Sequence, residues 1–178
     1  MDVRYSLVGA TEPITLAQVK AWLKVDFTTE DTTILTPMLT QIRELAEEAS
    51  GRSFIDKTIE YFEDDRELLS QWIKLPYPNH NAISSVVLDG NTLADADYAK
   101  TGLNQFKIKL MASGSNTDDD DMGLFVTYTT LANCPNGVKL AMLKEIAETY
   151  EKRGNTFEGG LVKLTSNFYN YLQQWKVY

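Results

Sequence analysis

The sequence contains few of the residues on which most enzyme active sites depend. It has one histidine, His80, and one cysteine, Cys134, among 178 residues. An intrachain disulfide is therefore excluded, and a zinc site built from several Cys or His ligands is not predicted. A catalytic triad would have to use His80, which lies in the turn-like segment YPNHNA, where a surface role is expected. We predict no enzymatic activity, no metal and no cofactor.

Clustered positive charge is also missing. The chain has 17 Lys and Arg against 25 Asp and Glu, for a net charge of -8, and no basic run. Since neutralising phosphates requires clustered basic side chains, DNA should touch this protein only weakly and without sequence specificity. No apolar run approaches the length of a membrane span, and the N-terminal MDVRYSLVGATEP does not resemble a signal peptide. We expect a soluble protein without a membrane partner.

The acidic run Asp118–Asp121 is the one segment that resembles a cation site. Aligned with an EF-hand loop, it lacks an oxygen ligand at Met122, and Thr129 stands where a bidentate Glu belongs. A solvated hairpin loop is the better interpretation. The pair Gly159-Gly160 lies between helical segments and forms no phosphate loop.

Helical periodicity is present near both ends of the chain. It predicts helices at about 15–25, 32–50 and 136–153. Thr15 and Gln18 have the spacing of a capping box, and Gly51 is a natural helix end. Pro37 fits if Thr36 caps the regular helix; otherwise it should bend a helix that begins earlier. Within the second helix, four charged residues are expected on the face opposite the apolar stripe: Arg43, Glu44, Glu47 and Glu48.

The middle of the chain changes to a period of two, which is typical of strands. The predicted strands are Lys57–Glu63, Trp72–Leu75, Ile83–Leu88, Phe106–Leu110 and Leu124–Thr129, with a turn at Asp89-Gly90. We therefore predict an α+β fold in one domain over residues 1–178. It would be an amphipathic helical bundle with an antiparallel β-meander inserted at about 57–130, mainly helical at both ends. The helices can pack together only if the ends of the insertion lie close to each other.

The last segment, at about 159–178, is rich in aromatic residues. One interpretation is core packing of a final helix, and the other is an arm that binds a partner, since aromatic residues are enriched at interfaces. The two are compatible if one face packs and the other docks. The residues predicted to bind the partner are Leu164, Phe168, Tyr171, Leu172, Trp175 and Tyr178.

Several short motifs, in order, resemble the head–tail connector (adaptor) family of long-tailed bacteriophages. That family has a Leu-x-x-Val/Ala-Lys-x-x-Leu opening, a helix that ends in a Thr/Ser-Gly-Arg turn, a Leu-Pro-x-x-Pro-like segment, and a later helix with a preceding proline and a Tyr-Glu-x-Arg end. The corresponding residues are Leu16, Val19, Lys20, Leu23; Ser50, Gly51, Arg52; Leu75, Pro76, Pro78; and Pro135, Tyr150, Glu151, Arg153. Pro78 stands one residue closer to Pro76 than the second proline of the family pattern does. The chain departs from simpler members in its longer β region, its Asp run and its aromatic tail.

The resemblance implies a virion structural protein that forms a closed, dodecameric ring at the head–tail junction. The ring would bind under the portal protein, extend the DNA channel, and receive the tail or a stopper protein. DNA would pass through without sequence-specific binding. The protein would be located in the virion, and in the host cytoplasm during assembly.

Three alternatives stay open. Another neck or tail protein, such as a tail terminator, would be dominated by β structure with few long helices. An unrecognised cytoplasmic enzyme would have a deep pocket with converging acidic residues. A cytoplasmic adaptor outside any virus would be a monomer or dimer and would form no ring.

Overall fold

The computed structural model of the chain describes residues 2–7, 11–26, 31–77, 80–102, 107–111, 123–152 and 165–176. Their contacts divide the chain into two compact units. The β unit comprises Met1–Thr11 and Ile55–Ala132, and the helical unit comprises Glu12–Phe54 and Asn133–Tyr178. Each unit has its own hydrophobic core.

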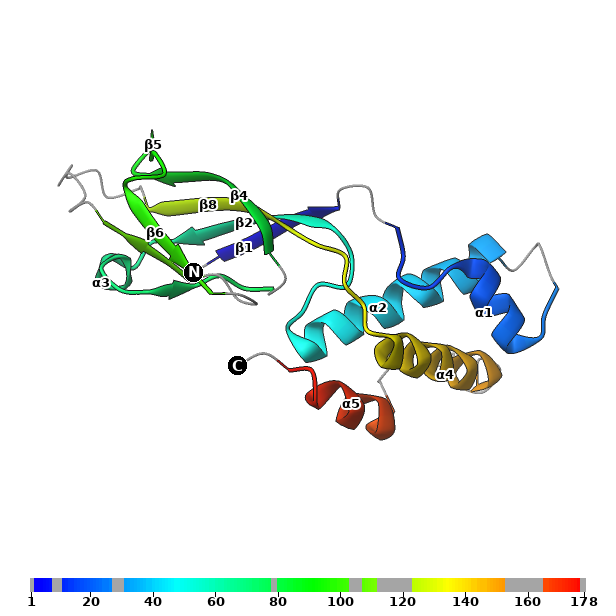
Figure 1. Cartoon of the computed structure of the whole chain (residues 1–178). Helices are drawn as coiled ribbons and strands as arrows, with labels where there is room; N and C mark the ends of the chain where they lie inside the picture. Colours follow the sequence, from blue (N-terminus) through cyan, green and yellow to red (C-terminus); the bar gives the residue numbers. More distant parts are fainter. Residues whose placement is uncertain are drawn as a thin grey trace. The chain divides into compact units, whose positions relative to one another are not determined.

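The β unit consists of two antiparallel sheets and one short helix (Figure 1). The larger sheet has the strand order β1-β2-β8-β4-β5, and the smaller has the order β3-β7-β6. The elements are β1 (Asp2–Leu7), β2 (Lys57–Glu63), α3 (Arg66–Leu69), β3 (Ile73–Lys74), β4 (His80–Leu88), β5 (Asn91–Thr92), β6 (Tyr98–Thr101), β7 (Lys107–Leu110) and β8 (Leu124–Thr130).

The core of the β unit follows from the period of two in its central strands. In β2, Ile59 and Tyr61 are buried, and their partners in β8, Tyr128 and Val126, are buried too. The smaller sheet contributes Ile73, Tyr98 and Ile108 to the same core. Directly paired residues of an antiparallel ladder point to one face, so each strand sends alternate side chains inward.

The predicted turn at Asp89-Gly90 joins β4 to β5. Both residues have positive φ, 50° for Asp89 and 77° for Gly90. Leu88 pairs with Asn91 across the two-residue connection. Positive φ at both central residues is the type I′ geometry that suits the twist of a hairpin, and Asp-Gly tolerates it well.

The helical unit contains α1 (Leu16–Leu23), a π-helical turn (Asp31–Leu35), α2 (Thr36–Ser50), α4 (Asn136–Lys152) and α5 (Ser166–Gln173). α2, α4 and α5 contact one another, and α1 contacts α4 (Figure 1). Their shared core includes Val19, Ile42, Met142 and Leu172. The helices therefore bury one apolar stripe each, as their amphipathic patterns predict.

Local signals set the helix ends. The capping box of α1 is present, because the backbone N–H of Gln18 donates to Thr15 Oγ1 and that of Thr15 donates to Gln18 Oε1. α2 ends at Gly51, which has φ of 67°. Pro37 lies in the first turn of α2, and the preceding turn is π-helical. The helical backbone thus begins at Asp31 as a π-helical turn, and the regular α-helix begins at Thr36, one residue before Pro37.

The predicted fold class was wrong in its emphasis. The protein is α+β, but it is not a helical bundle with an inserted meander, because two sheets build a unit with a core of its own. Nor is the N-terminus helical, since β1 (Asp2–Leu7) precedes the first helix. The larger sheet is also no meander, because β8 lies between β2 and β4. The alternation of Val3, Tyr5 and Leu7 with polar residues was the overlooked signal.

The single connector domain over residues 1–178 stays a prediction, because two cores can still unfold together. No helix in the part of the chain that the structure describes has the length and apolar character of a membrane span.

Hydrogen exchange will test how independent the two cores are. Ile59 and Ile42 are fully buried in different cores. We expect Ile59→Ala to destabilise the β unit, and Ile42→Ala the helical unit, by about 2–5 kcal/mol each. Amide exchange should then accelerate mainly in the substituted unit, as for separate cooperative units. Equal acceleration in both units would show one cooperative domain.

Candidate interaction surfaces

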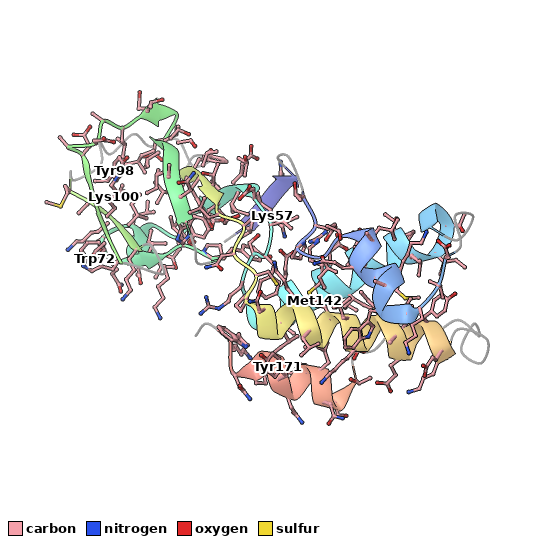
Figure 2. The ribbon with its side chains drawn as sticks, turned by 45° about the vertical axis from the view of Figure 1, so that its right-hand side comes forward. Lys57, Trp72, Tyr98, Lys100, Met142 and Tyr171 are labelled. Carbon is pink, nitrogen blue, oxygen red and sulfur yellow. The ribbon has the colours of Figure 1, made fainter. Side chains whose placement is uncertain are left out.

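The C-terminal helix α5 carries most of the residues predicted to bind a partner. Phe168 and Leu172 are buried in the core of the helical unit, and Tyr171 and Trp175 are partly buried against it. Figure 2 shows Tyr171 on α5 and Met142 on α4. Leu164 and Tyr178 lie outside the described residues. The apolar stripe of α5 therefore packs inward, and its partner-binding role stays a prediction.

Polar anchors hold α5 in place at both ends. Thr165 caps the helix, and buried Glu145 of α4 accepts hydrogen bonds from the Thr165 N–H (2.8 Å) and hydroxyl (2.7 Å). At the other end, Arg52 Nε donates to the carbonyl of Trp175 (2.6 Å). α5 is thus docked on α4 and on the turn that follows α2.

The side chain of Tyr171 on α5 occupies the space beside Gly137 on α4. A Cβ at Gly137 would collide with the hydroxyl oxygen of Tyr171. The face of α5 that stays exposed is polar except for Tyr169, of which 46% is exposed. Any contact that α5 makes with another protein must use this exposed face or the edges of Tyr171 and Trp175.

A buried arginine joins three carboxylates in the helical unit. Arg43 is only 1% exposed, with its Nε 2.9 Å from Glu12 Oε2 and its Nη1 2.6 Å from Glu47 Oε2. The more exposed Glu44 accepts at 3.3 Å. Burial alone would lower the pKa of Arg43, but the charges of Glu47, Glu12 and Glu44 raise it, so the guanidinium stays charged. Arg43 and Glu47 are thus buried although they belong to the charged face of the helix. Their spacing of four residues, which suits an ion pair, was the available signal.

The same network builds the Ser50-Gly51-Arg52 turn. Glu47 Oε1 accepts a hydrogen bond from the backbone N–H of Phe54 (2.7 Å), beyond the turn. Ser50 donates back to the carbonyl of Ala46 (2.7 Å). Because Arg52 then reaches Trp175, this short motif connects the end of α2 to α5.

The outer face of the larger sheet carries an aromatic pair. Phe62 and Phe125 are cross-strand neighbours, with ring centroids 4.5 Å apart. Val87 of β4 pairs with Phe125 from the other side. Phe125 is 48% exposed, so this row is an apolar spot on a mostly polar face. The alternation that predicts β2 and β8 places these residues opposite the core, which makes the row a candidate contact surface.

His80 has a structural environment. It begins β4 and is half-buried, not in a surface turn as expected. Its ring centroid lies 4.7 Å from that of Tyr128, and its Nε2 is 3.2 Å from the carbonyl oxygen of Pro76. Burial lowers the pKa of His80 to about 4, although the hydrogen bond to Pro76 opposes the shift. The ring is therefore neutral at physiological pH.

Neither the thiol nor the carboxylates form a recognisable catalytic or metal site in the described residues. Burial raises the pKa of Cys134 to about 12, so its sulfur is a protonated thiol, which is a poor nucleophile. Within the same ranges, no group of three Cys, His, Asp or Glu side chains is placed to hold a metal ion. Asp118–Asp121 lies outside them.

Comparison with known proteins identifies the fold. No family model and no curated protein sequence matches the chain. A chain of the virion of a native gene transfer agent particle is similar, with a TM-score of 0.70 and 12% identity over 100% of this chain and 96% of that chain. A chain from the neck of an empty particle, computed with C6 symmetry, has a TM-score of 0.68 and 13% identity over 100% and 96%. One from the neck of a native particle, computed with C12 symmetry, has a TM-score of 0.61 and 12% identity over 96% of each. Both units of this chain therefore belong to a fold already seen in solved structures.

Removing the buried arginine should destabilise the helical unit. In Arg43→Met, Glu47 would lose its buried cationic partner, which typically costs about 3–5 kcal/mol. Urea unfolding followed by circular dichroism measures the loss. The matched control is Lys152→Met, because Lys152 forms its ion pair with Glu148 on the surface. A comparable effect of both substitutions would contradict the assigned role of Arg43.

Proposed function

We propose that this protein is a virion structural protein that forms a ring at the head–tail junction of a tailed phage or phage-like particle. The observation that carries the proposal is the fold likeness over the whole chain to chains of gene transfer agent virions and necks. The order and spacing of the motifs that resemble the connector family support it independently, because they are features of the sequence alone. Three motif residues, Ser50, Gly51 and Arg52, build the turn that holds α5.

The finer role proposed is that of an adaptor. A dodecameric ring would bind beneath the portal protein and extend the DNA channel, and the tail or a stopper protein would bind below it. Repeated heterologous contacts between neighbouring copies, made through the helical unit, would close the ring. The neck of a native particle computed with C12 symmetry contains a chain of similar fold, which supports twelve copies.

The adaptor would act by contact and not by catalysis. The neutral His80 and the protonated Cys134 are both engaged in packing, which supports a structural role. DNA would pass through the channel without sequence-specific binding, and the net charge of -8 would limit adhesion. The protein would be assembled in the host cytoplasm and located in the virion.

A tail terminator is the principal alternative within the neck and tail. The two sheets of the β unit are what such a protein would share. However, α2 and α4 span 15 and 17 residues, longer than expected for a fold dominated by β structure. The helical unit therefore favours the adaptor.

Imaging of assembled particles tests the ring. Reconstruction of particles that carry a tagged copy of this chain should place it in one ring at the head–tail junction, with twelvefold symmetry. Native mass spectrometry of the portal-bound assembly should give twelve copies of the 20.1 kDa chain. Density on the capsid shell or along the tail tube would contradict the proposed function, and a sixfold ring would contradict the adaptor role.

We also propose that the C-terminal segment at about 159–178 docks on the portal. Because Phe168 and Leu172 point inward, the contact would be made by the exposed face of α5 around Tyr169, with Tyr171 and Trp175 at its edges. A large aromatic residue at the centre of an interface can contribute about 2 kcal/mol or more, which is about 30-fold in Kd.

Three variants separate docking from packing. Tyr169→Ala should weaken portal binding by about 30-fold, with an unchanged melting temperature, as for an interface residue. Phe168→Ala should lower stability by about 3–5 kcal/mol, as for a buried residue. Trp175→Ala is the intermediate case, and both its portal affinity and its melting temperature should be measured. If Tyr169→Ala binds the portal normally, docking lies elsewhere.

A further inference from the structure

The smaller sheet of the β unit turns one face toward its core and the other away from it. Ile73 of β3 pairs with Ile108 of β7, and both are buried. The next pair in the ladder is Lys74 with Lys107. Since successive residues of a strand point to opposite faces, Lys74, Lys107 and Lys109 all lie on the outer face. We call these three residues the lysine face.

The lysine face concentrates positive charge in a small area. Neighbouring strands are about 4.8 Å apart, and residues two apart in a strand are separated by about 7 Å. The attachment points of the three side chains therefore lie within about 1 nm of one another. The three strands contain no Asp or Glu. Among the described residues, no carboxylate forms an ion pair with any of the three lysines.

This concentration contrasts with the rest of the molecule. The whole chain carries a net charge of -8, so a polyanion is repelled by most of its surface. Trp72, of which 45% is exposed, immediately precedes β3 and so lies at the margin of the lysine face. Figure 2 labels Trp72 and Lys100 in this part of the β unit. Lys100 pairs with Ile108, so it belongs to the opposite face of the sheet.

We propose that the lysine face contacts the phosphate backbone of duplex DNA, which deepens the proposed function and rests on it. Lysine is a flexible point charge, whereas arginine would hold a phosphate with two hydrogen bonds. The face has no Arg, Asn or Gln that could read base edges. Contacts made here are therefore independent of sequence and short-lived.

Duplex DNA fits the face better than a protein partner does. A protein interface normally has an apolar anchor at its centre and charges at its rim. The lysine face has the reverse arrangement, with charges at its centre and Trp72 at its margin. Three phosphate contacts give a slope of about -2.7 in log K against log salt for each subunit. So few contacts give each subunit only a low affinity for DNA. A ring of subunits would repeat the contact around a DNA duplex and still let it slide.

The experiment is a titration of a short labelled duplex with the full-length protein, followed by fluorescence anisotropy over a range of salt concentrations. The test variant is Lys74→Gln/Lys107→Gln/Lys109→Gln. The matched control is Lys100→Gln/Lys139→Gln/Lys144→Gln, which changes the net charge by the same amount on other surfaces. We expect weak, salt-dependent binding by the unsubstituted protein, a nearly complete loss of the slope in the test variant, and the original slope in the control. Circular dichroism verifies that both variants are folded.

Four results would overturn the assignment. The unsubstituted protein fails to bind duplex DNA at low salt, or both variants weaken binding equally. A polyglutamate peptide binds the lysine face more tightly than the duplex, which indicates an acidic protein partner. Single-stranded DNA is preferred and Trp72→Ala abolishes its binding, which indicates base stacking. A ring seen at the head–tail junction together with any of these results rejects only the lysine face, whereas DNA binding without such a ring rejects the proposed function.

Discussion

The pairing of β2 with β8 is the constraint that lets helices from distant parts of the sequence meet. β2 follows the first helical segment of the chain, and β8 precedes α4. Their antiparallel register brings the start of β2 beside the end of β8, where Thr130 Oγ1 accepts from the Lys57 N–H (3.1 Å) and donates to the Ile55 carbonyl (3.2 Å). Because the two connections leave the sheet side by side, α2 and α4 can share one core although most of the β unit separates them in sequence. The helices could pack together only if these two ends lie close to each other, and this register meets that condition.

Within the helical unit, a buried ion pair connects segments on either side of a turn, as backbone pairing connects the strands of the β unit. Glu47 links Arg43, on its own helix, to the backbone of Phe54 beyond the turn. Taking these charges out of water is unfavourable, and only the full set of partners offsets it. The arrangement is therefore specific, because a shifted turn would leave a buried carboxylate unpaired. Through Arg52, the same turn fixes the position of α5.

In the proposed function, the distribution of charge would matter more than the net charge. A chain at -8 repels DNA on average, yet the outer face of β3 and β7 carries three lysines without a paired carboxylate among the described residues. A channel surface that is acidic overall would repel a duplex, and brief contacts with the lysine face would keep the duplex centred without binding it tightly. Rotational symmetry would multiply each weak contact, so a single subunit need bind only weakly for a ring to centre the duplex. The same multiplication would apply to contacts between subunits of a ring, so a modest exposed surface such as the Phe62–Phe125 row would suffice as a contact.

The sequence by itself determined the features that depend on neighbours along the chain. The capping box of Thr15 and Gln18, the Asp89-Gly90 hairpin and the full extent of β2 were all predicted, because their hydrogen bonds or periodicity span only a few residues. Only the tertiary structure decided the strand order, the separate core of the β unit, the burial of Arg43 and the inward turn of Phe168. Each of these depends on residues far apart in the chain, and a local pattern cannot show which face of a helix or strand another segment will cover.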